Sequence, residues 1–268
     1  MFVEFGGLVD HLPAWLMVLF RLTGVFILAP MLGSVTIPRQ VKVLLVLSLS
    51  FCVYPMLLEP TRASATFVGS VVANGFSLWT LIPTVGLELL LGVAVGYAAS
   101  LPLVGVQLGG RMIDQQMGLG LAGVINPEMD AQSGVVGEFF FIMAVAIFAL
   151  MGGHRVMFAT LIGSFDRVPL GGFTDFAGLV DLMIALMVIM YELAIRIAAP
   201  LLCLIFLQTV ALGFIARTVP QMNILSVGFV LRILVGAGFL AIFVSVGGAA
   251  YAQSLQRVLR LVWGFFSM

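Results

Sequence analysis

The sequence predicts an all-α polytopic membrane protein, and three observations support that prediction. Of its 268 residues, 62% are hydrophobic and 9% are charged, whereas soluble domains are typically about 45–50% apolar and about 25% charged. The hydrophobic residues form long runs, and a membrane-spanning helix needs about 20 mostly apolar residues. No stretch shows the alternating polarity that is typical of barrel strands. One soluble core cannot bury so much apolar surface, so we expect an integral membrane protein.

About six to eight apolar helical segments are expected along the chain. In order, the candidates cover residues 12–32, 41–58, 67–85, 85–106, 136–151, 179–212 and 224–251. The third and fourth candidates touch at Pro83, which predicts a broken or tightly turned pair of helices. The sixth candidate is too long for one simple span and contains Pro200. We therefore expect it to kink or to divide at that proline.

Charged residues occur inside the apolar segments or at their ends: Arg21, Glu88, Glu138, Glu192, Arg196 and Arg232. Charges at membrane depth normally face protein or water and have partners. Glu192 and Arg196 have the spacing of a local helical pair and are predicted to form a buried ion pair. For the other charges a proton or ion relay is one interpretation. We favour ion pairs within the protein or with other subunits, because a relay usually needs clustered titratable groups.

The sequence carries no motif of an enzyme, a metal site or a nucleic-acid-binding protein. Its two histidines, His11 and His154, lie far apart and have no metal-ligand spacing. No nucleophile elbow, P-loop or dinucleotide-binding motif is present. Cys52 and Cys203 are expected to be small buried hydrophobic residues. Residues 163–172 are expected to end a helix and turn. Because these motifs are missing, neither a cofactor nor a metal is expected. Twelve basic residues balance twelve acidic ones and form no basic block, so nucleic acid is not expected as a partner.

The connection at residues 114–127, DQQMGLGLAGVINP, is unusually apolar for a loop. It carries three glycines and no charge after Asp114. Glycine lowers the cost of folding the backbone back on itself, and an apolar constriction can exclude water and ions. From these residues alone, an ordinary re-entrant loop buried against neighbouring helices is an equally good interpretation.

Four stretches together carry a resemblance to a known family. They are RLTGVFILAPMLGSVTIPRQVKV at 21–43, DQQMGLGLAGVINP at 114–127, GGHRVMFATLIGSFDRVPLG at 152–171 and APLLCLIFLQTVALGFIARTVPQMNILSVGF at 199–229. In this order and spacing, the chain resembles the FliR family of type III secretion export-gate membrane proteins. That family includes flagellar members and their counterparts in virulence-associated secretion systems. The resemblance extends over nearly the whole chain.

The resemblance implies a subunit without catalytic activity that forms part of a channel in the bacterial inner membrane, within the flagellar basal body. Its implied partners are P-type and Q-type export-gate subunits, other membrane proteins of the export apparatus, the lipid membrane and the unfolded proteins that are exported. It implies a P-like portion at 1–180 and a Q-like helical hairpin at 181–268. Charges such as Arg21 or Glu138 can then be matched across subunits.

The resemblance also implies two sites. The segment matching the family's pore plug comprises Gly118, Leu119, Gly120, Leu121, Ala122, Gly123, Val124 and Ile125. Many relatives carry aromatic residues where this sequence has Leu121 and Val124. The tip of the Q-like hairpin, expected to face the cytoplasm, comprises Arg217, Pro220, Gln221, Met222 and Asn223.

Three other functions remain open. An export-gate subunit of an injectisome would share the same resemblance, although overall similarity favours the flagellar system. A small secondary transporter predicts internal repeats with paired, broken helices around a site at the membrane midplane. The sequences around Pro83 and Pro200 do not resemble each other in that way. A purely structural membrane scaffold is the third alternative.

Overall fold

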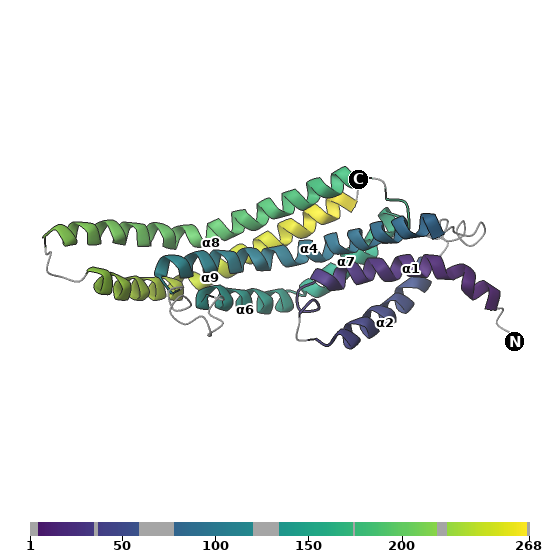
Figure 1. Ribbon diagram of the computed structural model, residues 1–268, viewed down its shortest axis with the longest axis horizontal. Helices are drawn as coiled ribbons and strands as arrows, with labels where there is room; N and C mark the ends of the chain where they lie inside the picture. The colour runs from purple at the N-terminus through teal and green to yellow at the C-terminus, as the bar shows by residue number, and fades with distance from the viewer. Residues whose placement is uncertain are drawn as a thin grey trace. The chain divides into compact units, whose positions relative to one another are not determined.

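The computed structural model describes residues 5–34, 37–58, 78–119, 134–173, 175–218 and 224–266, and every regular element in these ranges is a helix (Figure 1). The helices are α1 (Phe5–Leu28), α2 (Arg39–Leu57), α4 (Leu78–Met117), α6 (Val135–Leu150), α7 (Gly153–Arg167), α8 (Phe176–Thr218) and α9 (Ile224–Phe266). The prediction of an all-α protein with six to eight helical segments is confirmed for this part of the chain. Residues 67–77 of the third candidate segment lie outside the described residues.

Among the described residues, four helices are long and apolar enough to cross a membrane. The number rises to six if two bent pairs each count as one span: α6 with α7, and the two parts of α9, Val227–Ile242 and Val246–Phe266. The four are His11–Leu28, Arg39–Leu57, Leu81–Met117 and Phe176–Thr218. In lipid a helix satisfies all of its backbone hydrogen bonds internally, which explains why these apolar runs fold in this way. The prediction of a polytopic membrane protein is therefore supported by length as well as by composition.

No helix ends at Pro83 or at Pro200, the two prolines where a boundary or a division was expected. Helix α4 continues through Pro83 and Pro102 over 40 residues, and α8 continues through Pro200 over 43 residues. A proline removes one backbone hydrogen bond and usually bends or breaks a helix in water. In membrane proteins, neighbouring helices and local adjustment tolerate such prolines. The predicted boundary at Pro83 and a division at Pro200 are therefore wrong, and the alternative of a kink at Pro200 stays a prediction.

The chain forms two compact units, and each is discontinuous in sequence. Unit 1 comprises Met1–Ser100, Gly152–Leu186 and Arg257–Met268, and unit 2 comprises Leu101–Met151 and Met187–Gln256. Helices α4, α8 and α9 each contribute to both units. The expected P-like and Q-like portions are defined by likeness to other subunits, so that division stays a prediction.

In unit 1, α1 and the first half of α4 pack backbone against backbone. A side-chain carbon at Gly24 would overlap the Leu89 carbonyl oxygen, and one at Gly92 would overlap the Arg21 carbonyl oxygen. At Gly96 it would lie 2.7 Å from the Val25 carbonyl oxygen. Small residues at such a seam let two membrane helices approach closely.

Unit 2 has a second glycine seam and an antiparallel hairpin. A side-chain carbon at Gly105 or Gly109 of α4 would lie 2.8 Å from a backbone oxygen of α8. Arg196 of α8 pairs with Gln253 of α9, and further along α8 Thr209 pairs with Arg232. The partner's number falls as the α8 number rises, so these parts of α8 and α9 run antiparallel (Figure 1).

Candidate functional site

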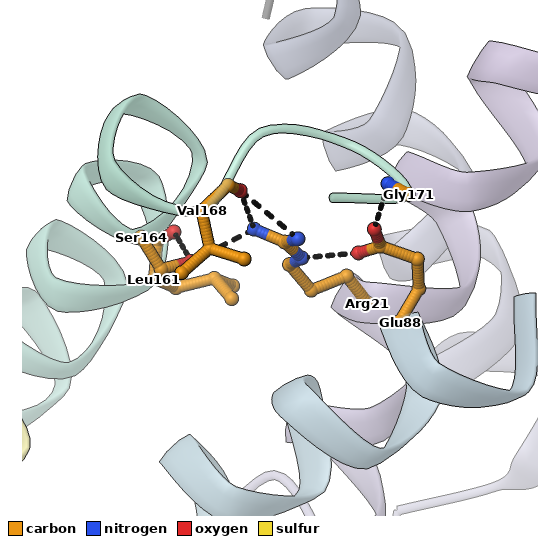
Figure 2. A network of polar contacts seen from close by, with 6 residues as sticks. All are labelled: Arg21, Glu88, Leu161, Ser164, Val168 and Gly171. Carbon is orange, nitrogen blue, oxygen red and sulfur yellow. Dashed lines mark hydrogen bonds and ion pairs between the residues drawn. The ribbon is translucent and has the colours of Figure 1, made fainter. Parts of the chain in front are cut away.

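Arg21 and Glu88 form a fully buried ion pair inside unit 1 (Figure 2). The Nε atom of Arg21 in α1 donates to Oε2 of Glu88 in α4. Both terminal nitrogens of Arg21 donate to the Val168 carbonyl oxygen at 3.2 Å, and Nη1 also reaches Ser164 Oγ at 3.3 Å. The second carboxylate oxygen of Glu88 accepts from the Gly171 backbone N–H at 2.8 Å. Both carboxylate oxygens of Glu88 and all three guanidinium nitrogens of Arg21 therefore have a hydrogen-bond partner.

This network fixes the turn that follows α7. The ring of Phe165 lies 4.3 Å from the guanidinium carbon of Arg21, which adds a cation–π contact. Helix α7 ends at Arg167, Val168 is extended, and Gly171 takes a left-handed conformation with φ 68°. The prediction that residues 163–172 end a helix and turn is confirmed. The turn is held by the ion pair as well as by its own proline and glycines.

The ion pair decides between the two interpretations of these charges. Arg21 and Glu88 neutralise each other within one chain and use their remaining hydrogen bonds on the backbone. They are a structural ion pair, as favoured from sequence, rather than part of a relay. Arg21 is matched within the chain and does not need a partner from another subunit, because Glu88 lies on the facing helix, 67 residues away in sequence.

Asp114, near the end of α4, binds the start of α6 in unit 2. Its side chain is buried and accepts two backbone hydrogen bonds from the start of α6, from Val136 N–H at 3.0 Å and Gly137 N–H at 2.9 Å. A side-chain carbon at Gly134 would overlap this carboxylate, and one at Gly110 would lie 2.6 Å from the Gly137 Cα atom. A carboxylate at a helix N-terminus satisfies unpaired N–H groups and complements the helix dipole. The two ends of the connection are thus fastened to each other.

The predicted plug segment is described only at its start. Gly118 has φ 79°, the left-handed conformation that glycine adopts without strain. The Leu119 N–H donates to the Asp114 carbonyl oxygen at 3.1 Å, which ends α4. Gly120, Leu121, Ala122, Gly123, Val124 and Ile125 lie outside the described residues. The plug therefore stays a prediction.

The hairpin tip is likewise described only at its edge. Arg217 is exposed in the last turn of α8, where a cation complements the helix dipole. Pro220, Gln221, Met222 and Asn223 lie outside the described residues.

Glu192 and Arg196 are both exposed, so the prediction of a buried pair is wrong for the single chain. The buried face of α8 carries Leu193, Ala194 and Ile197, and a spacing of four residues places Glu192 and Arg196 together on the other face. Arg196 donates to the side-chain oxygen of Gln253 at 3.3 Å. Pairing between Glu192 and Arg196 stays a prediction.

The remaining singled-out residues lie at the surface of their units or bond locally. Glu138 is exposed in the first turn of α6, and Arg232 donates to Thr209 Oγ1 at 3.1 Å. Cys52 and Cys203 are exposed, contrary to expectation. Among the described residues, no group of His, Cys, Asp or Glu could hold a metal ion.

Sequence reasoning missed the glycine seams and the role of Asp114. The seams have a recognisable signal, because Gly92 and Gly96, and Gly105 and Gly109, each form the small-xxx-small spacing of close helix packing. Asp114 has no such signal, because its partners lie 22 and 23 residues further along the chain.

Comparison with known proteins gives a consistent result. The sequence pattern of a family described as "Bacterial export proteins, family 1" matches residues 12–258. The chain is 28% identical to the flagellar biosynthetic protein FliR of Bacillus subtilis (strain 168), with 90% of each chain covered. It is 26% identical to the protein of the same name from Escherichia coli (strain K12), over 83% of this chain and 81% of that one. It is also 26% identical to the Yop proteins translocation protein T of Yersinia pestis, over 67% of this chain and 71% of that one.

Proposed function

The chain belongs to the bacterial export proteins of family 1, and from this premise we propose that it is a subunit of the flagellar type III protein export gate. The observation that carries the proposal is the family match over residues 12–258, supported by flagellar relatives that align over most of their own length. The injectisome alternative rests on the Yersinia relative, which covers a smaller part of this chain. The flagellar system is therefore the better supported of the two.

As a member of this family, the chain is a membrane component of an export apparatus. In the proposal, it lines a channel without catalysing a reaction and carries unfolded flagellar proteins across the inner membrane at the flagellar basal body. Its proposed partners are the P-type and Q-type gate subunits and other membrane proteins of the apparatus. Phe206, Leu207 and Phe214 on α8 are about 70% exposed or more in the single chain, which supports a face that partners or lipid cover.

The proposed division of labour places a P-like portion at 1–180 and a Q-like hairpin at 181–268. The antiparallel arrangement of α8 and α9 in unit 2 supports the hairpin. Its tip, which includes Arg217, is proposed to face the cytoplasmic entrance of the channel.

The segment from Gly118 to Ile125 is proposed to plug the closed channel. Asp114 supports this proposal, because it fastens the start of α6 to the end of α4 and so fixes both ends of the connection. A segment anchored at both ends can seal a pore and still move when an unfolded protein passes. The apolar residues between the ends suit a constriction that excludes water and ions.

The subunit role is tested by assembly. We expect the full chain, expressed alone, to aggregate or be degraded, and co-expression with P-type and Q-type subunits to yield one large complex on size-exclusion chromatography. A stable monomer in detergent that fails to associate with both partner types would overturn the proposed role.

The plug is tested by ion conductance of the assembled complex in planar bilayers. Changing Leu121 and Val124 together to Asp should make the constriction easy to wet and raise the resting conductance, while assembly is unchanged. Changing the same two residues to Phe is the matched control, and the complex should then stay closed. If the Asp variant assembles and conducts no more than the parent, the segment is a packing element and not a plug.

A further inference from the structure

Helices α1 and α2 of unit 1 are close together at one end and separate at the other. Near the start of α1, His11 Nδ1 lies 2.7 Å from the Tyr54 hydroxyl, and the rings of Trp15 and Phe51 lie 5.1 Å apart. Towards the end of α1, the two helices leave a groove of about 340 Å³. The groove is lined by Leu19, Thr23, Phe26, Ile27, Lys42, Val43, Val46 and Leu47. The splayed pair is visible in Figure 1.

The length of the groove is apolar. Its lining side chains are aliphatic or aromatic except for two, and the hydroxyl of Thr23 is already used, because it donates to the Leu19 carbonyl oxygen at 2.7 Å. Phe26 is buried behind the groove and contacts Phe158 of α7, with ring centroids 6.2 Å apart. Val43 and Ile27 at the rim are more than half exposed. The surface therefore accepts a hydrocarbon chain without leaving a polar group unpaired.

One end of the groove is cationic. Lys42 Nζ donates to the Gly33 carbonyl oxygen at 3.0 Å, which turns the ammonium away from the apolar length and towards the connection between the helices. An ammonium has three N–H donors, and no acidic partner of Lys42 is found among the described residues. Arg39 is three residues before Lys42, so both side chains lie on the same face of α2, and Arg39 is exposed. Helix α2 begins at Arg39 without a side-chain cap, so the positive end of its dipole lies here too.

The positions of the cations and of the apolar groove along the two helices match the headgroup and acyl chain of a lipid. The candidate spans end at Leu28 in α1 and begin at Arg39 in α2, so Lys42 and Arg39 lie at the end of two spanning helices. Cations at such positions lie at the level of the lipid headgroups, and the residues beyond them lie in the hydrocarbon. The cationic end and the apolar length of the groove are therefore arranged in the order of a phospholipid's headgroup and acyl chain.

We propose that the groove between α1 and α2 binds an anionic phospholipid, whose phosphate lies against Lys42 and Arg39 and one of whose acyl chains lies along Val43, Val46 and Phe26. Charge complementarity favours this occupant, because residues 29–58 contain Arg39 and Lys42 and no acidic residue. A zwitterionic lipid would bring its own cation to a site that already has two. This site is independent of the export role proposed above.

The test uses the full chain, purified from membranes in a mild detergent with whatever subunits accompany it, stripped of lipid and titrated while native mass spectrometry counts bound lipid. The probes are dioleoyl phosphatidylglycerol and dioleoyl phosphatidylcholine, which share acyl chains and differ in net charge. Lys42→Gln should weaken phosphatidylglycerol binding about fivefold and leave phosphatidylcholine binding nearly unchanged. Arg155→Gln is the matched control, because it removes an exposed cation from α7 of the same unit and should change neither.

A second pair of variants tests the acyl chain. Val43→Trp fills the groove and keeps both cations, and should remove the tightly bound phosphatidylglycerol. Leu44→Trp, at the adjacent exposed position of α2 that does not line the groove, should keep it. Equal binding of the two lipids by the parent would overturn the proposal, as would unchanged phosphatidylglycerol binding in both Lys42→Gln and Val43→Trp. So would a Val43→Cys variant that cross-links to a partner subunit in the lipid-bound complex, because the groove would then hold a helix.

Discussion

Replacing Glu88 by alanine is expected to be among the most destabilising changes to unit 1. The substitution leaves the Arg21 guanidinium, which is fully buried, without its counter-charge. Removing one partner of a buried pair typically costs about 3–5 kcal/mol. The Gly171 N–H also loses its acceptor, which adds about 1–3 kcal/mol if the group stays buried. For a chain of this size, such a loss corresponds to a fall in melting temperature on the order of 10 °C.

The double variant Arg21→Met with Glu88→Leu distinguishes the effect of an unpaired buried charge from the effect of lost packing. It fills a similar volume and leaves no buried charge. Only the Val168 carbonyl, the Gly171 N–H and the Ser164 hydroxyl each lose a hydrogen-bond partner. Replacing a buried ion pair by apolar residues is often neutral or stabilising. The double variant should therefore recover on the order of 2 kcal/mol relative to Glu88→Ala. A double variant that is more stable than the single variant Glu88→Ala is the signature of a buried ion pair.

The assay is the fraction of detergent-solubilised protein that remains folded on size-exclusion chromatography after heating to a series of temperatures. Heating is expected to be irreversible, so the midpoints rank the variants and are not equilibrium values. Glu138→Ala is the matched control, because it makes the same substitution at an exposed position. It should cost less than about 1 kcal/mol, from the helix dipole alone. A double variant as unstable as Glu88→Ala, or a single variant as stable as the parent, would refute the argument.

Three further predictions concern the seams and the charges of the two units. Gly92→Leu should reduce the yield of folded protein severely, because its side chain meets the backbone of α1, whereas Gly86→Leu, with nothing within 4 Å, should match the parent on the same chromatogram. Asp114→Ala should speed amide hydrogen exchange at the start of α6 at least tenfold, since two N–H groups lose their acceptor, and equal exchange would mean that the carboxylate does not hold this end. Glu192→Ala and Arg196→Ala should each shift stability by less than about 1 kcal/mol, as exposed charges do; a large loss in the assembled complex but not in the free chain would place them at a subunit contact.

The helices themselves could be predicted from the sequence. A run of about 20 apolar residues in lipid has one favourable backbone conformation, because only a helix satisfies its own N–H and C=O groups. That requirement is local, so composition and length located most of the helices. The turn at residues 168–172 was predicted for the same reason, since Pro169, Gly171 and Gly172 act on their own backbone.

Whether the helices α4 and α8 continue through their prolines depended on tertiary structure. The local rule predicted a break or tight turn at Pro83 and a kink or division at Pro200, because a proline removes a hydrogen bond whatever surrounds it. In the folded chain, the rest of each helix is held by its packing. In α4 the contacts of Gly92, Gly96 and Gly105 with neighbouring helices extend well beyond the proline. The loss of one bond is then too small to end the helix.

The partners of the buried polar groups were decided by tertiary structure alone. Arg21 and Glu88, and likewise Asp114 and the start of α6, are far apart in sequence and meet only because two helices pack side by side. The sequence placed charges in apolar segments and so determined that partners must exist, since an unpaired charge is costly there. It could not determine which partner, because that choice depends on the rotation and register of one helix against another. Glu192 and Arg196 make the same point: their spacing put them on one face of α8, and only packing decided that this face is exposed.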